Sequence, residues 1–94
     1  MSSSLRVLIV DDSEADAALI VATLRGGGYD VVACVVDAPA SMRAALVRES
    51  WDVITSDHPM PHFSAPAAHA LAMELCPLAP FIIVSGEIDV GLAV

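Results

Sequence analysis

Four short runs of strand-forming residues divide this 94-residue chain, and they constrain its fold more than any other feature. The runs are mostly apolar, as expected for parallel strands that are covered on both faces. The runs are LRVLIV (5–10), DVVACVV (30–36), WDVITS (51–56) and PFIIV (80–84). Helix signals lie between them, so the sequence predicts strands that alternate with helices.

The first helix is expected to begin after Ser13, which is a good N-cap residue. Asp16, three residues later, completes the sequence form of a capping box, and the glycines at 26–28 should end the helix. One face of this helix is formed by Ala15, Leu19, Ala22 and Thr23, and is extended by Ala18 and Val21.

Two further helices are predicted. Asp37 and Pro39 are start signals for the second. This helix should direct Met42, Ala45 and Leu46 inward and Arg43, Arg48 and Glu49 outward. Residues 57–65 should form a loop, and Pro66 can open a third helix that ends near 76–77.

Alternating strands and helices imply right-handed crossovers and a doubly wound parallel sheet with helices on both faces. The length fits one α/β domain, over 5–94, preceded by a disordered polar tail at 1–4. Residues 87–94 could begin a helix or extend in another way.

The charge balance excludes several classes of partner. Twelve acidic residues stand against four arginines, there is no lysine, and the net charge is −8. No basic patch can form, so we expect no binding to nucleic acid or to an anionic membrane.

No apolar run is long enough to span a membrane, and 1–4 does not resemble a secretory signal. Cys34 and Cys76 lack metal-ligand spacing and suggest reduced, buried thiols in a cytoplasmic protein.

Acidic residues follow two of the predicted strands. Asp11 and Asp12 end the first strand, Asp57 ends the third, and the hydroxyl residue Ser85 follows the fourth. Ligands bind outside the carboxyl ends of the strands in open α/β sheets, so these side chains should converge at one edge. Crowded carboxylates need a cation to remain ionised together, and oxygen ligands of this kind suit Mg²⁺.

Each of these acids taken alone has a simpler reading as a solvated turn or a helix cap. The histidines His58 and His62 flank Asp57, but they lack Cys or His partners at ligand spacing, so no zinc site is expected. His69 is expected on a helix surface, and Trp51 and Met60 are interpreted as packing residues.

The pattern resembles the receiver domains of two-component response regulators, such as the chemotaxis regulator and the receivers of hybrid sensor histidine kinases. The resemblance lies in LRVLIVDDSEAD (5–16), WDVITSDHPMP (51–61) and FIIVSGE (81–87), and it covers about 5–87. Asp57 followed by Met60 and Pro61 is its most specific signal. The resemblance implies a flavodoxin-like sheet with strand order 2-1-3-4.

The resemblance also implies roles for individual residues. Asp57 would be the phosphoacceptor, and Ser85 would donate a hydrogen bond to a phosphoryl oxygen. Mg²⁺ would be bound directly by Asp12 and Asp57, through water by Asp11, and by the backbone carbonyl of Pro59. The partner would be a sensor histidine kinase or a histidine phosphotransfer protein, and the chain itself would not be an enzyme in the usual sense.

The sequence departs from the receiver pattern in three ways. Receivers carry a lysine after a fifth strand, whereas this chain has no lysine and ends at Val94. We therefore expect the fifth strand and fifth helix to be missing. His62 and Ala65 stand where glycines are frequent in the family.

Without a fifth strand, the strand at 81–84 would be an unprotected apolar edge, so a homodimer is expected through this edge or through the C-terminal segment. One alternative function is a degenerate receiver that serves as a phosphorylation-independent dimerisation or docking module. A weaker alternative is a phosphohydrolase with an aspartyl nucleophile, which would need a second acid near the position of Pro59.

Overall fold

A computed structural model describes residues 3–57 and 64–84 of the chain. Seven elements alternate along this part, as the sequence predicted. They are β1 (Ser3–Val10), α1 (Glu14–Gly26), β2 (Tyr29–Val36), α2 (Pro39–Arg48), β3 (Val53–Asp57), α3 (Ala65–Leu75) and β4 (Phe81–Val84).

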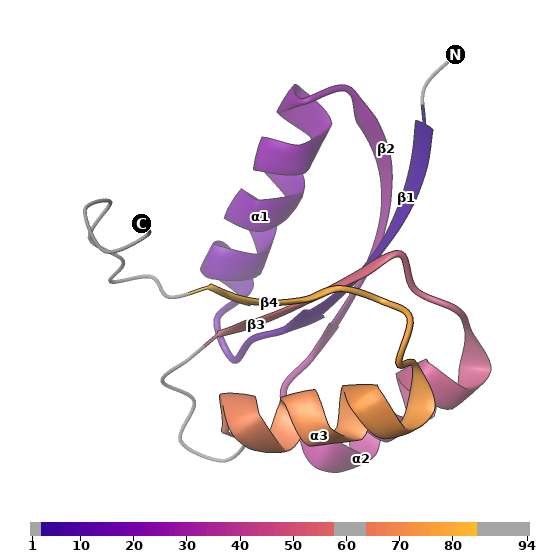
Figure 1. Cartoon of the computed structure of the whole chain (residues 1–94). Coiled ribbons are helices and arrows are strands. Elements are labelled where there is room, and N and C mark those ends of the chain that lie inside the picture. Colours follow the sequence, from indigo (N-terminus) through magenta and orange to yellow (C-terminus); the bar gives the residue numbers. More distant parts are fainter. Residues whose placement is uncertain (1–2, 58–63, 85–94) are drawn as a thin grey trace.

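The four strands form one parallel sheet in the order β2-β1-β3-β4. Helix α1 covers one side of the sheet, and α2 and α3 lie together on the other side (Figure 1). The doubly wound architecture and the strand order are therefore confirmed. No fifth strand is present within residues 3–57 and 64–84. The predicted third helix lies in place, while 87–94 are outside the described residues.

Strand β1 begins earlier than the sequence suggested. Ser3 and Ser4 belong to the strand and pair with Tyr29 and Asp30 of β2. The expectation of a disordered tail over 1–4 therefore does not hold for these two serines. Serine is a weak strand former, and it is ordered here by the neighbouring strand, which no local propensity encodes.

The start of α1 contains half of the expected capping box. The Ser13 hydroxyl accepts a hydrogen bond from the Asp16 N–H at 3.3 Å, so Ser13 is the N-cap. The Ser13 N–H, however, donates to Asp11 Oδ1 at 2.9 Å instead of to Asp16. The aspartate that precedes the helix thus takes the place that the capping box assigns to the residue inside it.

The buried face of α1 differs from the face identified in the sequence. Ala17 is buried against the sheet, with Ile20, Val21 and Leu24 partly buried beside it. Leu19, which was predicted to share one face with Ala15 and Ala22, is instead 66% exposed. The helix carries apolar residues all around, so its hydrophobic pattern does not fix its rotation. The packing of α1 against Val7 and Ile9 of β1 fixes that rotation instead.

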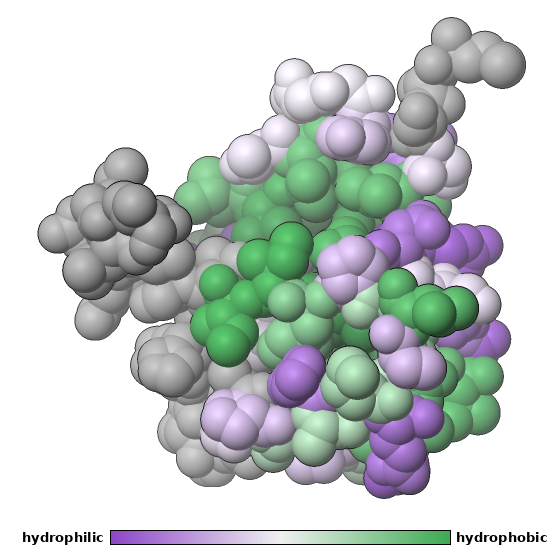
Figure 2. Space-filling model, viewed as in Figure 1, coloured by the Kyte–Doolittle hydropathy of each residue, from purple (hydrophilic) through white to green (hydrophobic). Residues whose placement is uncertain are grey.

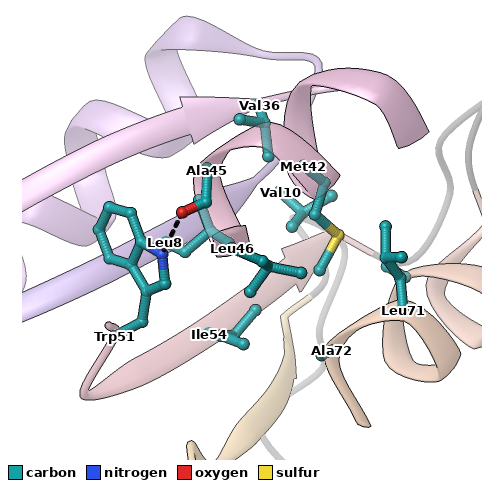
Figure 3. Close-up of a cluster of buried hydrophobic side chains, with 11 residues drawn as sticks. Leu8, Val10, Val36, Met42, Ala45, Leu46, Trp51, Ile54, Leu71 and Ala72 are labelled. Carbon is teal, nitrogen blue, oxygen red and sulfur yellow. Dashed lines mark hydrogen bonds between the residues drawn. The ribbon is translucent and has the colours of Figure 1, made fainter. Parts of the chain in front are cut away.

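The larger core lies between the sheet and helices α2 and α3 (Figure 3). Met42, Ala45 and Leu46 of α2 point into it and Arg43 and Arg48 are exposed, as predicted, while Glu49 is only half-exposed. The Trp51 indole N–H donates to the Ala45 carbonyl at 3.0 Å. This bond satisfies the polar atom of a buried aromatic ring and confirms Trp51 as a packing residue.

Helices α2 and α3 begin differently. The N-cap of α2 is Ala38, which makes no side-chain cap, so Asp37 is not the capping residue. Ser64 caps α3 by accepting a hydrogen bond from the Ala67 N–H at 3.2 Å, and Pro66 lies in the first turn. A proline is compatible with the first turn because the N–H groups there have no acceptor within the helix, so a residue without an N–H loses no hydrogen bond.

Two further expectations concern the burial of the two cysteines and the exposure of His69. Cys34 and Cys76 are free and half-buried. His69 is exposed on α3, as expected, and its ring lies 5.0 Å from that of Phe81. Among the described residues, no helix is long and apolar enough to cross a membrane.

Candidate functional site

The acidic residues predicted to converge follow adjacent strands in matching register. Val10 of β1 pairs with Ser56 of β3, so Asp11 and Asp57 come directly after paired residues. Asp57 in turn pairs with Val84, the residue before Ser85. The backbone therefore brings the positions of Asp11 and Asp57 side by side at the carboxyl edge of the sheet.

Several predicted site residues cannot be placed further. Only the backbone position of Asp57 is described, at the end of β3. His58, Pro59, Met60, His62 and Ser85 lie outside the described residues, so their predicted roles stay predictions.

Asp11 is held tightly at this edge. It is buried, with 4% of its surface exposed. Its backbone N–H donates to the Val36 carbonyl at 2.9 Å, and its Oδ1 accepts the Ser13 N–H at 2.9 Å. The backbone of Asp11 is thus bonded to the neighbouring strand and its carboxylate to the start of α1, which suits a residue that positions other groups.

Asp12 has a different environment, because its side chain is exposed to solvent. Among the described side chains, which include Asp11 and Asp12 but not Asp57, no three His, Cys, Asp or Glu residues come close enough to hold a metal ion. A metal at this edge therefore needs a further donor. The donor set of the sequence prediction supplies one in Asp57, and carboxylate oxygens are of the kind that Mg²⁺ prefers.

Two polar side chains precede Asp57 on β3. Ser56 and Thr55 are both buried, at 1% and 6% exposure. The Thr55 hydroxyl has no hydrogen-bond partner within the described part of the chain. An unsatisfied buried hydroxyl costs about 1–3 kcal/mol. Thr55 lies two residues before Asp57, and the sequence did not predict it as a feature of the candidate site.

A groove of about 670 Å³ opens beside the acidic edge, between α1 and β2. Asp11 and Asp12 lie on its wall together with Asp37, an acid that the sequence reading treated only as a helix signal. Asp37 follows the end of β2, so the same argument that selected Asp11 and Asp57 would have selected it. The carboxyl edge is therefore more acidic than predicted.

Solved structures that are similar to this chain include two receiver domains. The receiver domain of the sensor histidine kinase PA1611 from Pseudomonas aeruginosa PAO1, with a magnesium ion coordinated in its active-site cleft, is 23% identical, with a TM-score of 0.71. The beryllofluoride-activated NtrC receiver domain is 26% identical, with a TM-score of 0.68. The matches cover 95% and 99% of this chain, and 73% of each of those domains.

No protein-family model matches the chain, and the search of curated proteins gave no significant match. The likeness to the two receiver domains lies in the three-dimensional arrangement of the elements, at sequence identities of 23% and 26%.

Proposed function

We propose that this chain, which has the fold of a response-regulator receiver domain, accepts a phosphoryl group on Asp57 in a two-component phosphorelay. The observation that carries the proposal is the register of β1 and β3. It sets the position of Asp57 beside that of the buried Asp11, next to the exposed Asp12. A sheet edge with this acid arrangement and this fold is the setting in which receiver domains carry out phosphotransfer.

The reaction is a displacement at phosphorus. A carboxylate oxygen of Asp57 would form a P–O bond while the P–N bond to a histidine of the partner breaks. The imidazole nitrogen keeps the electron pair of the broken bond and takes up a proton, and the product is an aspartyl phosphate. Ser85 would donate a hydrogen bond to a phosphoryl oxygen.

Mg²⁺ is the cofactor of this proposal, and the donor set fits it. Asp12 and Asp57 would bind it directly, Asp11 through water, and Pro59 through its backbone carbonyl. The bound cation would neutralise negative charge on the phosphoryl group and on the clustered carboxylates. The hydrogen bond from the Ser13 N–H keeps Asp11 oriented for this task.

The partner in this proposal is a sensor histidine kinase or a histidine phosphotransfer protein in the cytoplasm. The chain would act as a signalling protein and not as an enzyme that turns over a released substrate. A homodimer also belongs to the proposal, because Ile82 and Ile83 of β4 are 49% and 52% exposed. Apolar surface is visible where β4 crosses the face shown in Figure 2.

Labelling with acetyl phosphate, or with a phosphohistidine donor, in the presence of Mg²⁺ tests the phosphoacceptor directly. The wild type should gain an acid-stable, alkali-labile phosphate, and Asp57→Asn should gain none. Asp30→Asn is the matched control, since Asp30 is an exposed aspartate near the opposite edge of the sheet. Equal labelling of wild type and Asp57→Asn would refute the proposal.

A second function, docking or dimerisation without phosphorylation, is favoured by the exposed apolar residues of β4. Beryllofluoride with Mg²⁺ separates the two functions. It should shift the amide signals around Asp57 and Ser85 if the chain is a phosphoacceptor, and leave them unchanged if it serves only for docking.

A further inference from the structure

Strand β2 forms one edge of the sheet, and this edge lacks the usual protection against pairing. It pairs with β1 over eight consecutive residues without a bulge. The strand contains no lysine and no proline, and Asp30 is its only charged residue. Edge strands usually carry such features because their free backbone groups invite another strand to pair.

The outward backbone groups of β2 can be identified. The Val36 carbonyl accepts a hydrogen bond from the Asp11 N–H, so it points toward β1. Because backbone groups alternate between the two sides of a strand, Val31, Ala33 and Val35 present their N–H and C=O groups to the outside. No strand pairs with this side within the described part of the chain.

The groove between α1 and β2 runs beside this edge. Its lining includes the half-exposed Val35 of β2, and half of the α1 residues that line it have small side chains. The small residues are Ala17, Ala18 and Ala22. Larger side chains there would fill the space, so these alanines leave a groove of about 670 Å³. That volume lies in the range of about 300–1,000 Å³ found for binding pockets.

The charges of the groove are strongly polarised. Asp12, Glu14 and Asp37 lie with Asp11 at the end where β1 and β2 finish and α1 begins. The single basic residue, Arg25, lies in the last turn of α1. Glu14 and Arg25 are separated by about 16 Å along the helix axis. Glu14 and Asp37 lie outside the proposed Mg²⁺ ligand set, and acids spread along a groove in this way suit positive groups spread along a chain.

We propose that the outer edge of β2 and the adjoining groove bind an extended segment of a partner protein in which basic and apolar side chains alternate. The segment would add to the sheet as a strand, with its backbone bonded to Val31, Ala33 and Val35. Its basic side chains would lie on the α1 side, with their stems on Val35 and their charges near Glu14 and Asp37, two groove acids outside the proposed Mg²⁺ ligand set. Its apolar side chains would lie on the opposite face, beside the 46% exposed Val32.

A second copy of this chain fits the edge less well than a basic partner. Strand β2 itself supplies an acid and no basic residue to the acidic end of the groove. This interaction is independent of phosphotransfer at Asp57.

The test uses a six-residue peptide of alternating arginine and valine, blocked at both ends, which is long enough to span the groove. Amide chemical shifts of the protein are followed by NMR as the peptide is added. We expect saturable binding with shifts concentrated in 29–37 and in 14–25. A peptide of the same composition with its arginines and valines in two separate blocks is the control for unspecific charge attraction, and should bind about tenfold more weakly.

Two variants locate the site. Ala33→Pro removes an outward N–H without removing a bond to β1, and prolines are tolerated at strand edges. Val35→Lys places a positive charge in the groove and should act even if the proline variant does not fold. Both should weaken binding about tenfold or more, whereas Val47→Lys, at a 72% exposed valine of α2, should not.

Three results would overturn the proposal. These are equal affinity for the two peptides, unchanged affinity in a folded Ala33→Pro or Val35→Lys variant, and shifts in 29–37 that depend on protein concentration without peptide. The last result would assign the edge to a second copy of the chain.

Discussion

Asp11 Oδ1 accepts a hydrogen bond from the Ser13 N–H at 2.9 Å, and this contact ties the carboxyl end of β1 to the start of α1. The same carboxylate is a candidate magnesium ligand through water. Its structural role and its proposed metal role can be separated by substitution, because the first needs only a hydrogen-bond acceptor and the second needs a negative charge.

Replacement of Asp11 should separate these roles. Asp11→Ala removes the acceptor and should lower the free energy of unfolding by about 1–3 kcal/mol. Asp11→Asn keeps an acceptor oxygen and should retain more of the stability while weakening Mg²⁺ binding. Urea unfolding and Mg²⁺ titration by NMR measure the two effects. Equal stability of the two variants would show that the bond to Ser13 contributes nothing.

Asp12→Asn should change the stability of the fold little and the affinity for Mg²⁺ strongly. The Asp12 side chain is exposed, so the free energy of unfolding should change by less than about 0.5 kcal/mol. Affinity for Mg²⁺ should fall about tenfold or more, because even the loss of a group that only supports a metal ligand costs about that much. Glu14→Gln, an exposed acid in the first turn of α1, is the control and should retain Mg²⁺ binding. An unchanged Mg²⁺ affinity in Asp12→Asn would remove Asp12 from the proposed ligand set.

The two serine caps can be compared directly. Ser13 caps α1 and Ser64 caps α3, each through its hydroxyl. Ser13→Ala and Ser64→Ala should each lower the free energy of unfolding by about 1 kcal/mol, measured from the midpoint of urea unfolding. Ser13→Asp retains an acceptor and should restore most of the loss at α1. If Ser13→Ala is as stable as the wild type, the cap has no net effect.

Two methionines provide a matched pair for the core. Met42 is fully buried between α2 and the sheet, whereas Met73 of α3 is 52% exposed. Met42→Ala should cost about 2–5 kcal/mol because it removes buried surface and leaves a cavity. Met73→Ala removes the same atoms and should cost much less. Thermal unfolding followed by circular dichroism compares them, and similar losses would contradict the assigned core.

Self-association through β4 is tested with Ile82→Lys. The wild type is expected to dimerise at tens of micromolar, because β4 exposes Ile82 and Ile83 on the two faces of the sheet. The added charge should shift the chain toward monomer in size-exclusion chromatography with light scattering. Leu78→Lys, at a 96% exposed leucine outside the strands, is the control. A monomeric wild type would contradict the expected dimer.

Local sequence signals predicted most of the elements. Strands β1 to β4 are short apolar runs, and Ser13, Pro39 and Pro66 mark helix starts at or within two residues of the observed positions. Such signals act over a few residues, so they can be read without knowing the neighbours. The inward face of α2 was also predicted correctly, because its charged residues leave only one apolar face.

Local sequence signals were insufficient where packing against a second element decided the rotation of a helix or the partner of a hydrogen bond. The apolar residues around α1 permitted several rotations, and packing on β1 and β2 selected the one that buries Ala17 and exposes Leu19. The same reason explains why the Ser13 N–H bonds to Asp11 and not to Asp16. The end of β1 brings the Asp11 carboxylate to the start of the helix.

The sequence by itself determined the order of strands and helices and the acids that follow the strands, because both depend on residues close together in the chain. The strand order was expected only from the resemblance to receiver domains. The tertiary structure decided it, and so placed the positions of Asp11 and Asp57 side by side and left β2 and β4 at the edges of the described sheet. It also decided that Asp37 joins Asp11 and Asp12 along a groove beside β2. Pairing between strands and packing of helices join residues that are distant in sequence, so no local pattern encodes them.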